Sequence, residues 1–403
     1  MSVAAASVPS VAAGPLRVEV VEDARELTDR IAAWEELAAH AIEANVFYEP
    51  WMLLPALEAY GVGGQLLFLC IWGPHSADGS PPLHGFFPLE RRGRWRRLPL
   101  STVRLWRHEH CYLCNPLIRR ERGAECLLAL LRWLRSNLRG AALLEAEYVS
   151  ADGPFAAMLG EALTRHRRPV FRCESSTRAV WRLRPDGDPR RPAALSPTRR
   201  RTLERKQRRL AEAGRVAFAI LPPNGDVRRW IDAFLQLEKA GWKGRAGTAL
   251  ACTGADRRFF TTAAVAAFER GRLLAHGLYL DDRPIALRCS FLAGDGSFAF
   301  KTAYDEAFSR FSPGVLLELD NLRRLGGQAA ARWMDSCTAA DNFVINGLWD
   351  DRRALGALTA STGRWAGDLL VGLLPSLTRL KRTLFSRRAS TAVGNDAPAE
   401  EES

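Results

Sequence analysis

Three consecutive strand-like segments in the second half of the chain constrain its fold more than any other feature. Only the short links "DD" and "GDG" separate them, and links of this length suit tight antiparallel hairpins. A sheet built on such a meander needs helices to cover its apolar faces, so the fold class is predicted to be α/β (α+β), with a mixed, mostly antiparallel sheet. The three segments are RLLAHGLYLD (272–281), RPIALRCSFLAG (283–294) and SFAFKTAYD (297–305).

Strand-like and helical segments follow one another in the same order in both halves of the chain. The order β-α-α-β-β-β-α-β-α is predicted twice, with residues 111–118 as a strand and residues 170–183 as a closing hairpin. A stretch rich in proline and charge lies between the halves and is typical of a linker. We therefore predict tandem domains with these limits: a disordered leader at 1–15, a first domain at 16–184, a linker at 185–197, a second domain at 198–355, a basic helical tail at 356–386 and a disordered end at 387–403.

The chain is strongly basic. Its 57 lysines and arginines exceed its 45 aspartates and glutamates, which gives a formal net charge of +12. This balance favours anionic partners such as nucleic acid, acidic lipid or a phosphate-bearing substrate. No apolar run approaches the roughly 20 residues of a membrane-spanning helix, so we expect a cytoplasmic protein. The leucine- and arginine-containing tail could hold it at an anionic inner-membrane surface, although a helix packed on the domain explains the tail equally well.

Eight cysteines are scattered along the chain and are predicted to be reduced core residues. One segment, RHEHCYLC (107–114), also brings two histidines next to a Cys-x-x-Cys pair. A structural zinc site usually draws four ligands from two separated pairs, whereas these four lie within seven residues. We therefore predict no metal.

The third strand of the meander carries an isolated lysine. Phe298, Phe300, Thr302 and Tyr304 alternate with small residues and with Lys301, so one face is predicted to be largely aromatic and the other small except for the lysine. A core strand with one snorkelling lysine explains the pattern as well. The functional interpretation is that Lys301 and Tyr304 bind substrate where the strand ends at a cleft.

A helix is predicted to begin soon after this strand, at Ser312-Pro313-Gly314. Ser312 suits the N-cap and Pro313 the first helical position. Glycine costs about 1 kcal/mol relative to alanine inside a helix, and less in the first turn. It leaves an unshielded backbone N–H at the positive end of the helix dipole, where proteins bind phosphate. An ordinary helix start remains the alternative.

A basic helix is predicted over residues 197–213. Residues 198–209 contain seven basic side chains and one acidic side chain. A solvated helix face is the ordinary explanation of such a run. The functional interpretation is that the helix binds an acidic acceptor, with Arg200 and Lys206 taking part. No motif that reads nucleic acid is recognisable, so no specific nucleic-acid partner is expected.

Three carboxylates are candidates for the general base of a transferase. An acceptor amine must lose a proton, and a carboxylate with a raised pKa can remove it. Glu238 lies near the end of a helix in EKAGWKG, where Trp242 and Lys243 are predicted to bind substrate. Asp305 and Asp335 lie at strand ends. A surface or capping role is the alternative for each carboxylate.

Three hairpin-linked strands followed by a helix resemble the core of the GNAT acyltransferases. Several segments resemble more specifically the CelD/BcsL type, which is named for a link to cellulose biosynthesis. That type is related to the Fem-type transferases, which also carry tandem GNAT domains. The segments are NVFYEPWMLLPAL (45–57), LEKAGWKGRAGTAL (237–250), RPIALRCSF (283–291), FKTAYDEAFSRFSPGVLL (300–317), MDSC (334–337) and INGLW (345–349).

The resemblance implies an acyl-CoA donor, acetyl-CoA or another, whose pyrophosphate lies on the N-terminus of the helix after the third strand. It assigns donor binding to Arg310, Ser312, Gly314 and Val315. GNAT enzymes often carry a Gln/Arg-x-x-Gly-x-Gly/Ala loop at this place, and RFSPGV keeps only Arg310 and one glycine. In the first half the equivalent helix follows NPLIRRERG, without a glycine at its start. That half is expected to be a degenerate copy that shapes the acceptor cleft.

Three functions are compatible with this sequence. The first, which we predict, is transfer of an acyl group from CoA to an amine or hydroxyl of a small polar acceptor, or of a sugar- or lipid-linked one, by direct attack on the thioester. The second is a Fem-like transferase that uses aminoacyl-tRNA. The third is a non-catalytic GNAT-derived module in envelope polysaccharide biosynthesis, such as that of cellulose or another exopolysaccharide. The sequence leaves the acceptor and the oligomeric state open.

Overall fold

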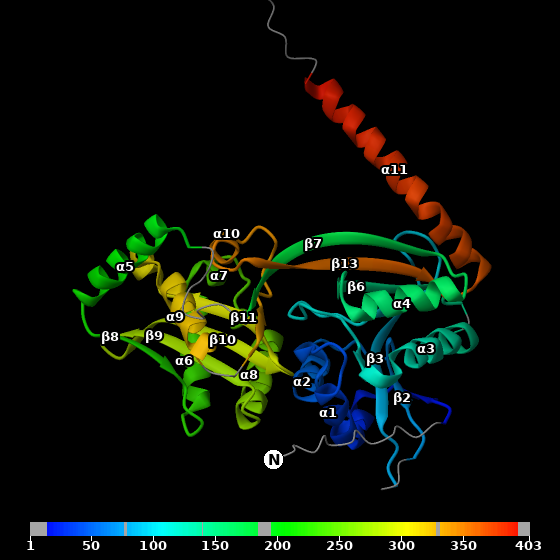
Figure 1. The fold of residues 1–403 in the computed structure, drawn as a ribbon, viewed down its shortest axis with the longest axis horizontal. Coiled ribbons are helices and arrows are strands. Elements are labelled where there is room, and N and C mark those ends of the chain that lie inside the picture. Colours follow the sequence, from blue (N-terminus) through cyan, green and yellow to red (C-terminus); the bar gives the residue numbers. More distant parts are fainter. Residues whose placement is uncertain (1–13, 76–78, 139, 184–194, 328–330, 394–403) are drawn as a thin grey trace, which may run out of the picture.

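The computed structural model describes residues 14–75, 79–138, 140–183, 195–327 and 331–393. Their strands form one continuous sheet of 13 strands flanked by helices (Figure 1). The order is β1-β2-β3-β4-β6-β13-β7-β12-β11-β10-β9-β8, and β5 pairs with β3. The strands are β1 (Arg17–Val21), β2 (Leu66–Trp72), β3 (Leu83–Arg92), β4 (Thr102–Leu105), β5 (Leu117–Ile118), β6 (Leu143–Ser150), β7 (Val170–Arg182), β8 (Val216–Ile220), β9 (Leu273–Leu280), β10 (Arg283–Ala293), β11 (Gly296–Tyr304), β12 (Trp333–Asp335) and β13 (Asp351–Ser361).

Several helices begin where a short polar side chain caps the first turn, as the sequence pattern indicates. Ser196 accepts a hydrogen bond from the Arg199 N–H, and Thr253 accepts one from the Asp256 N–H. The α-helices are α1 (Ile31–Ala39), α2 (Pro50–Tyr60), α3 (Gly123–Asn137), α4 (Pro154–Arg165), α5 (Pro197–Ala211), α6 (Val227–Ala240), α7 (Trp242–Arg245), α8 (Gly254–Glu269), α9 (Pro313–Gly327), α10 (Phe343–Asn346) and α11 (Trp365–Val393). The 3-10 helices are η1 (Ala24–Arg30), η2 (Val46–Tyr48), η3 (Arg120–Arg122) and η4 (Glu306–Phe311).

The two halves of the sheet repeat one arrangement. β1 to β4 are antiparallel neighbours, and β4 then pairs in parallel with β6. In the same way β8 to β11 are antiparallel, and β11 pairs in parallel with β12. The "DD" hairpin is present, since Asp281 and Asp282 both have positive φ, as a type I′ turn requires. The predicted fold class is therefore confirmed, although the two mixed sheets are joined into one.

The long strands β7 and β13 join the halves and exchange places between them (Figure 1). β7 precedes the second half in sequence, yet its last residues pair with β12. β13 follows the second half in sequence, yet it pairs with β6 of the first half. The two strands are also antiparallel to each other along most of their length. Each strand therefore finds its partners far away in the sequence.

The structure corrects four sequence predictions, and the first two follow from this exchange. Residues 170–183 do not form a hairpin, because β7 runs without a turn and pairs with β13 instead. The tail does not become helical at residue 356, because residues 351–361 are the strand that completes this pair. The helix begins only at Trp365 and continues to Val393, beyond the predicted end at residue 386. In the first half, only Leu117 and Ile118 of the predicted strand 111–118 are in a strand.

Some predicted segments lie largely outside the described residues. They are the leader at 1–15, the linker at 185–197 and the residues after 393. The limits proposed for the two domains stay a prediction.

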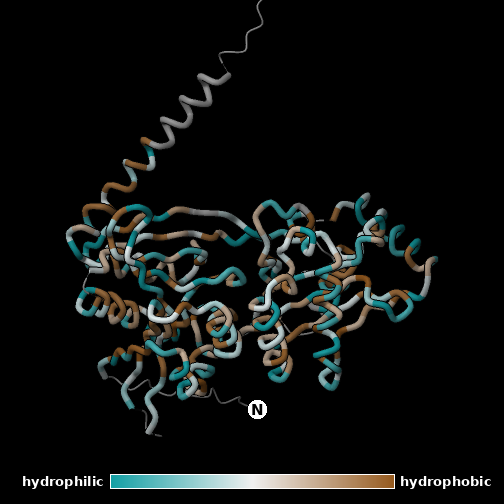
Figure 2. Tube along the Cα trace, turned by 180° about the vertical axis from the view of Figure 1, so that it is seen from behind, coloured by the Kyte–Doolittle hydropathy of each residue, from teal (hydrophilic) through white to brown (hydrophobic). Residues whose placement is uncertain are grey.

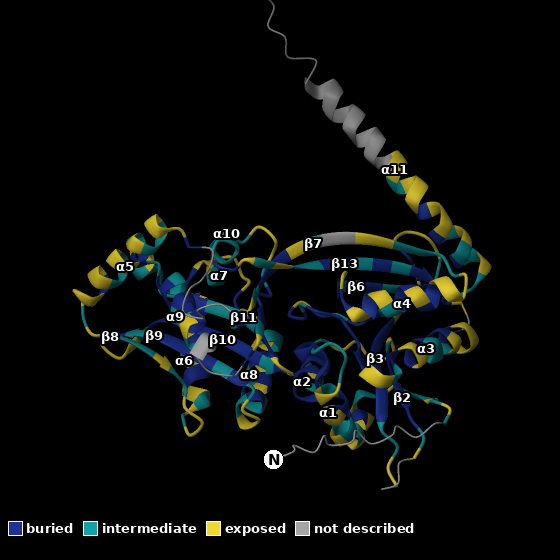
Figure 3. Ribbon diagram, in the orientation of Figure 1, coloured by how far each residue is buried: buried dark blue, intermediate teal, exposed yellow. Residues whose placement is uncertain are grey.

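Buried apolar side chains form one large cluster and two smaller ones. The large cluster covers the face of β10 and β11 that packs against α6 and continues into the first half, where Phe47 lies 5.5 Å from Phe298 between ring centroids. A second cluster covers the opposite face, under α9. A third joins Trp95 and Leu143 to α11. Figure 3 shows the buried residues concentrated along the sheet.

Candidate functional site

The parallel pair β11–β12 separates soon after it forms. The two strands are in register only at Gly296–Trp333, Ser297–Met334 and Phe298–Asp335. β12 then ends, whereas β11 continues to Tyr304 with β10 as its only strand partner among the described residues. One edge of residues 299–304 is therefore left without a neighbouring strand, so its backbone groups can pair with other partners, as the Thr302 carbonyl does with Lys243.

A β-bulge in the same stretch changes which side chains share a face. The register of β10 with β11 shifts between Cys289 and Ser290, so Phe300 is the extra residue. Phe298, Phe300 and Lys301 consequently all point to the α6 side. Thr302 and Tyr304 lie on the other side of the sheet, where a Cβ added at Gly314 of α9 would meet both.

The expectation of one aromatic face with Lys301 alone on the opposite face is therefore wrong. Strict alternation holds on either side of a bulge but not across it.

The N-terminus of α9 lies beside the open end of β11. Pro313 is its first residue, as predicted. Ser312 precedes it in the left-handed conformation, with φ 55°, and its carbonyl accepts from the Val315 and Leu316 N–H groups. The Ser312 hydroxyl accepts a hydrogen bond from Lys206 Nζ at 2.7 Å. Lys206 thus places a cation at the start of the helix.

Gly314 leaves room at this helix start. A Cβ added there would lie 3.7 Å from Tyr304 Cδ1, an ordinary van der Waals contact, so packing within the protein does not demand glycine. The first turn contains no acidic residue. Among the described residues the Gly314 N–H has no hydrogen-bond partner. The combination of a free N–H, a nearby lysine and the helix dipole suits a phosphate group.

Two predicted basic residues lie elsewhere on this side of the molecule. Arg310 is exposed, and its guanidinium carbon lies 4.7 Å from the Phe311 ring centroid. Arg200 lines a small cavity between α5 and α9. Within the described residues, no hydrogen bond or ion pair joins either arginine to Ser312 or Gly314.

The equivalent helix of the first half, α3, begins differently from the sequence prediction. Gly123 is its first residue, so a glycine does stand at its start. A Cβ added there would lie 2.8 Å from Met158 Sδ, so a neighbouring side chain fills the space. Arg122 pairs with Glu125, which puts a carboxylate in the first turn.

On the other face of the second half, three predicted residues meet in a buried charge cluster. The Glu238 carboxylate is fully buried and accepts hydrogen bonds from Lys243 Nζ at 3.1 Å and from the Leu250 N–H at 2.8 Å. Lys243 also donates to the Thr302 carbonyl at 3.0 Å. Lys301 Nζ lies 3.9 Å from the same carboxylate. Two lysines thus share one glutamate beside the open edge of β11.

Burial lowers the pKa of Lys301. The neighbouring Lys243 ammonium lowers it further, and the Glu238 carboxylate opposes both effects. A lysine in such a place loses its proton more easily than one in water. The Trp242 side chain, next to this cluster, is exposed, and the Trp242 backbone N–H donates to Glu306 Oε1 at 2.6 Å.

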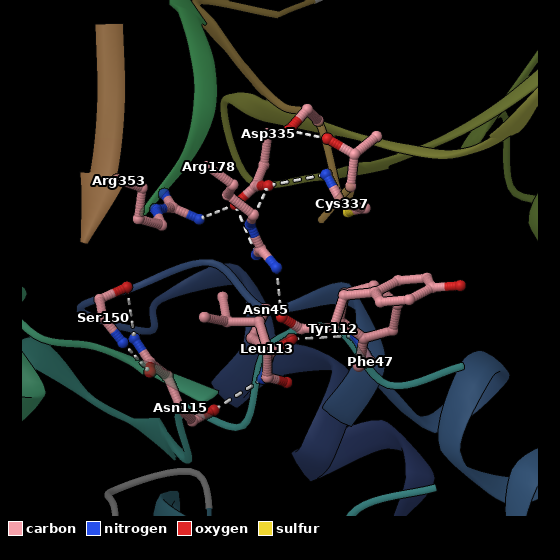
Figure 4. A network of polar contacts seen from close by, with 12 residues as sticks. Asn45, Phe47, Tyr112, Leu113, Asn115, Ser150, Arg178, Asp335, Cys337 and Arg353 are labelled. Atoms are coloured by element: carbon pink, nitrogen blue, oxygen red, sulfur yellow. Dashed lines mark hydrogen bonds and ion pairs between the residues drawn. The ribbon is translucent and has the colours of Figure 1, made fainter. Parts of the chain in front are cut away.

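Asp335 is the centre of a buried ion cluster rather than a free carboxylate (Figure 4). Arg178 Nε lies 2.6 Å from Asp335 Oδ1, and Arg353 pairs with Oδ2. The Cys337 N–H also donates to Oδ1 at 3.0 Å. Burial alone would raise the pKa of Asp335, but the two guanidinium groups outweigh burial and lower it. Arg178 further donates to the Tyr112 carbonyl at 2.6 Å, so the cluster ties β7, β12 and β13 to the first half.

Asp305 caps a helix. Its carboxylate accepts from the Ala307 N–H at 3.0 Å and pairs with Arg283 at 2.5 Å. With Tyr304 it lines a groove of about 410 Å³ between α6 and η4. Both Asp305 and Asp335 are therefore engaged in ion pairs, and neither shares the cluster around Glu238.

Sequence reasoning missed a second polar group, whose charges and that of Lys301 influence each other. His110 Nε2 lies 3.0 Å from Asp256 Oδ1, and the Tyr60 hydroxyl donates to the same oxygen at 2.6 Å. His110 Nδ1 is buried and has no partner in the described part of the chain. Burial, and then the charge of Lys301, lower the pKa of His110, so the ring is neutral near pH 7. The ring centroid lies 6.2 Å from that of the bulged Phe300.

The only signal in the sequence for this pair was the RHEHCYLC segment, which we considered as a metal site. Within the residues that the structure describes, no group of three or more His, Cys, Asp or Glu side chains is placed to hold a metal ion. Asp256 lies 146 residues away in sequence, so no local pattern links it to His110.

A known protein family matches the part of the chain that contains β9, β10, β11 and α9. Residues 197–343 match the family described as the acetyltransferase (GNAT) domain. This segment, about a third of the chain, is therefore similar to a GNAT domain. No curated protein sequence is significantly similar to the chain.

Solved structures extend the likeness to most of the chain. One is described as FemX, with a TM-score of 0.53 and 12% identity over 85% of this chain and 96% of that chain. Another is a conserved protein of unknown function from Bacteroides thetaiotaomicron, with a TM-score of 0.51 and 10% identity over 86% of this chain and 99% of that chain. At these identities the likeness concerns the fold alone.

Proposed function

We propose that the protein transfers an acyl group from acyl-CoA, and from acetyl-CoA in particular, to an amine or hydroxyl of a polar acceptor. The observation that carries this proposal is the open edge of β11 next to the free N-terminus of α9. A strand edge offers hydrogen bonds to the amides of a pantetheine chain, and a helix N-terminus offers an N–H and a positive potential to its pyrophosphate.

The residues on the α9 side fit the donor. The Gly314 N–H and Lys206 lie where a pyrophosphate gains from both charge and hydrogen bonding. Ser312 positions Lys206, and Val315 belongs to the same first turn. We therefore assign Lys206 to the donor, whereas the sequence suggested the acceptor.

The residues on the α6 side fit the acceptor. The acceptor nitrogen or oxygen attacks the thioester carbonyl carbon, the C–S bond breaks, and CoA leaves as a thiolate. We propose that His110 Nδ1 takes the acceptor's proton, because this nitrogen is unpartnered and neutral, while Asp256 fixes the ring from the other side. Lys301, Lys243 and Glu238 then orient the acceptor beside the bulge of β11.

Calorimetry with acetyl-CoA tests the donor site. Gly314→Glu places a carboxylate where the pyrophosphate would bind, and we expect a loss of affinity of about 100-fold or more. Gly314→Ala is the matched control, because its methyl group has room, and it should bind within a few-fold of the wild type. Equal affinity of all three proteins would refute the phosphate assignment.

Kinetics with a panel of amine acceptors test the base. His110→Gln should lower kcat by about 100-fold or more while the Kd for acetyl-CoA is unchanged. Asp256→Asn, a positioning change, should lower kcat less and shift the acidic limb of the pH profile. His40→Gln, on an exposed histidine, is the control. Unchanged kcat in His110→Gln would remove His110 from the mechanism.

The identity of the acceptor and the cellular location are part of the same proposal. We propose a sugar- or lipid-linked acceptor in envelope polysaccharide assembly, as the resemblance to the CelD/BcsL type suggests, and a cytoplasmic location. The support is the basic character of the chain and the exposed Trp242 beside Lys243, which suit a polar, anionic acceptor. Assays with nucleotide-sugar and lipid-linked amines would identify it.

An aminoacyl-tRNA-dependent reaction is the second candidate. It is favoured by the FemX-like fold and by α5, whose side chains Arg201, Arg205, Arg208 and Arg209 are all exposed. Thermal shift measurements with charged tRNA and with acetyl-CoA separate the two functions. Stabilisation by tRNA alone would favour this candidate, and stabilisation by acetyl-CoA alone would favour the first.

A further inference from the structure

The outer face of α11 carries an apolar stripe. Its side chains are spaced four, four, four and three residues apart, so they follow one side of the helix. They are between 47% and 79% exposed, and they account for five of the nine large apolar side chains that are exposed in the described part of the chain. The stripe consists of Trp365, Leu369, Leu373, Leu377 and Leu380.

A different face of α11 fixes the helix to the body. Val371 and Leu374 are buried in a small cluster with Trp95 and Leu143 of the first half. The stripe is therefore not what holds the helix in place. Figure 1 shows α11 leaving the body at an angle, and Figure 2 shows hydrophobic residues along its first turns. Exposed apolar patches of this kind mark interaction surfaces.

The last two residues of β3 and the turn after them form an exposed basic loop, residues 91–97, next to α11. Residues 91–97 read RRGRWRR, and all five arginines are exposed. Trp95, in the middle of the loop, is buried in the same cluster as Val371 and Leu374, so the loop packs directly against α11. Arg91, Arg92 and Arg94 also line a hollow of about 700 Å³. The described residues place no carboxylate within ion-pair distance of Arg94 or Arg97.

We propose that α11 and the 91–97 loop form a docking surface for a membrane that contains anionic lipids. The stripe spans about 22 Å at about 1.5 Å per residue, and it would lie in the plane of the interface with Trp365 at one end. Arg94, Arg96 and Arg97 bind the lipid phosphates, whereas Arg91 and Arg92 pair with Glu22 and Glu90. The sequence that follows the stripe, residues 381–388, adds four basic residues and no acidic one.

The helix lies on such a surface rather than crossing it. Among the described residues, no helix is long and apolar enough to span a bilayer. Charge favours a membrane over a second copy of this chain, because the basic residues 91–97 lie next to α11 and residues 381–388 follow the stripe in sequence. A stripe meant for a second copy of this chain would instead bring these like charges together.

Co-sedimentation of the full chain with vesicles tests the proposal. The chain should pellet with vesicles of 70% phosphatidylcholine and 30% phosphatidylglycerol, and about tenfold less with pure phosphatidylcholine. Leu369→Ser/Leu373→Ser/Leu377→Ser should lower binding to the anionic vesicles by about tenfold or more. All three side chains are exposed, so the fold should be retained, as circular dichroism would check.

Matched variants control for composition and charge. Val62→Ser removes an apolar side chain with 58% exposure, against 59% for Leu369, and should bind like the wild type. Arg94→Glu/Arg97→Glu should weaken binding, whereas Arg228→Glu/Arg258→Glu, with the same charge change on the second half, should not. The proposal is overturned if the wild type fails to pellet with anionic vesicles, or if the triple variant binds as well as the wild type. A concentration-dependent dimer that the triple variant abolishes, without vesicle binding, would assign the stripe to a second copy.

Discussion

In each half of the sheet, a helix leads into the strand that forms the parallel pair, and these two helices begin differently. Gly123 begins α3 and Gly314 lies in the first turn of α9. A side chain added at Gly123 would have to displace the end of the Met158 side chain, whereas a methyl group at Gly314 has room. The space beside Gly123 is therefore filled by Met158, and the space beside Gly314 is less crowded.

The charges at the two helix starts also differ, with a carboxylate at α3 and a lysine at α9. Glu125 provides a carboxylate in the first turn of α3, and Arg122 neutralises it. α9 has no acidic residue in its first turn, and Lys206 adds a positive charge through Ser312. An anion already occupies the favourable end of the α3 dipole, whereas the α9 dipole is left for an external anion. This difference supports a donor site in the second half alone.

The third residue of each parallel pair is an acid, and its surroundings also differ. Glu145 lies opposite Arg104 in β4–β6, and Asp335 lies opposite Phe298 in β11–β12. Burial raises the pKa of Glu145, and the hydrogen bond from Trp95 only partly offsets this. The guanidinium groups of Arg178 and Arg353 lower the pKa of Asp335. Burial therefore disfavours the charged form of Glu145, whereas the ion pairs of Asp335 connect β7, β12 and β13.

The largest expected effect comes from removing these charges. Asp335→Asn leaves the buried Arg178 without its counter-charge, and we expect a loss of about 3–5 kcal/mol in the free energy of unfolding. Glu145→Gln keeps an acceptor for Trp95 and should change stability by less than about 1 kcal/mol. Denaturant titration at pH 7 measures both values. Equal losses would show that the two halves use their acids in the same way.

The pH dependence of stability should have opposite signs at the two acids. The folded pKa of Asp335 is lowered, so its contribution is complete above the unfolded value of about 3.9 and is lost as the pH falls through the folded pKa. The folded pKa of Glu145 is raised, so its contribution is complete below the unfolded value of about 4.3 and is lost as the pH rises through the folded pKa.

Melting curves between pH 3 and pH 8 test this prediction. The deficit of Asp335→Asn relative to the wild type should shrink toward pH 3, and Glu145→Gln should gain on the wild type as the pH rises. Parallel curves for all three proteins would contradict it.

A smaller effect is expected from the cations at the two helix starts. Lys206→Met removes the charge beside Ser312 and should weaken acetyl-CoA binding by about five- to tenfold. Arg122→Met removes the corresponding charge at α3 and should leave the Kd unchanged. Calorimetry on both variants compares the halves directly. A loss of affinity in Arg122→Met would place a donor site in the first half.

The smallest effect concerns the two glycines. Gly314→Ala should raise the free energy of unfolding by a few tenths of a kcal/mol, up to about 1, because alanine favours the helix and has room. Gly123→Ala should lower it by about 1 kcal/mol, because Met158 must shift. Differential scanning calorimetry resolves changes of this size. Stabilisation by both substitutions would mean that Met158 yields without cost.

Local sequence was enough to predict the elements that depend on local physics. The meander of β9, β10 and β11 follows from its two short turns, and the start of α9 at Pro313 follows from Ser-Pro-Gly. Glu238 and Lys243 are five residues apart, and their proximity could be expected from one helix end. Caps, tight turns and helical spacing all act within a few residues, so a pattern of a few residues can reveal them.

The tertiary structure decided everything that joins distant segments. It brought β13 to β6 and β7, moved Lys301 onto the face of Phe300 through a bulge, and paired Asp335 with two arginines. It also placed His110 against Asp256 across the boundary between the halves. Such contacts depend on which surfaces pack together after the strands have paired, and no segment of sequence carries that information alone. For this reason the sequence indicated a GNAT-like core and a phosphate-binding helix, while the identity of the proposed base emerged only from the packing of the first half against the second.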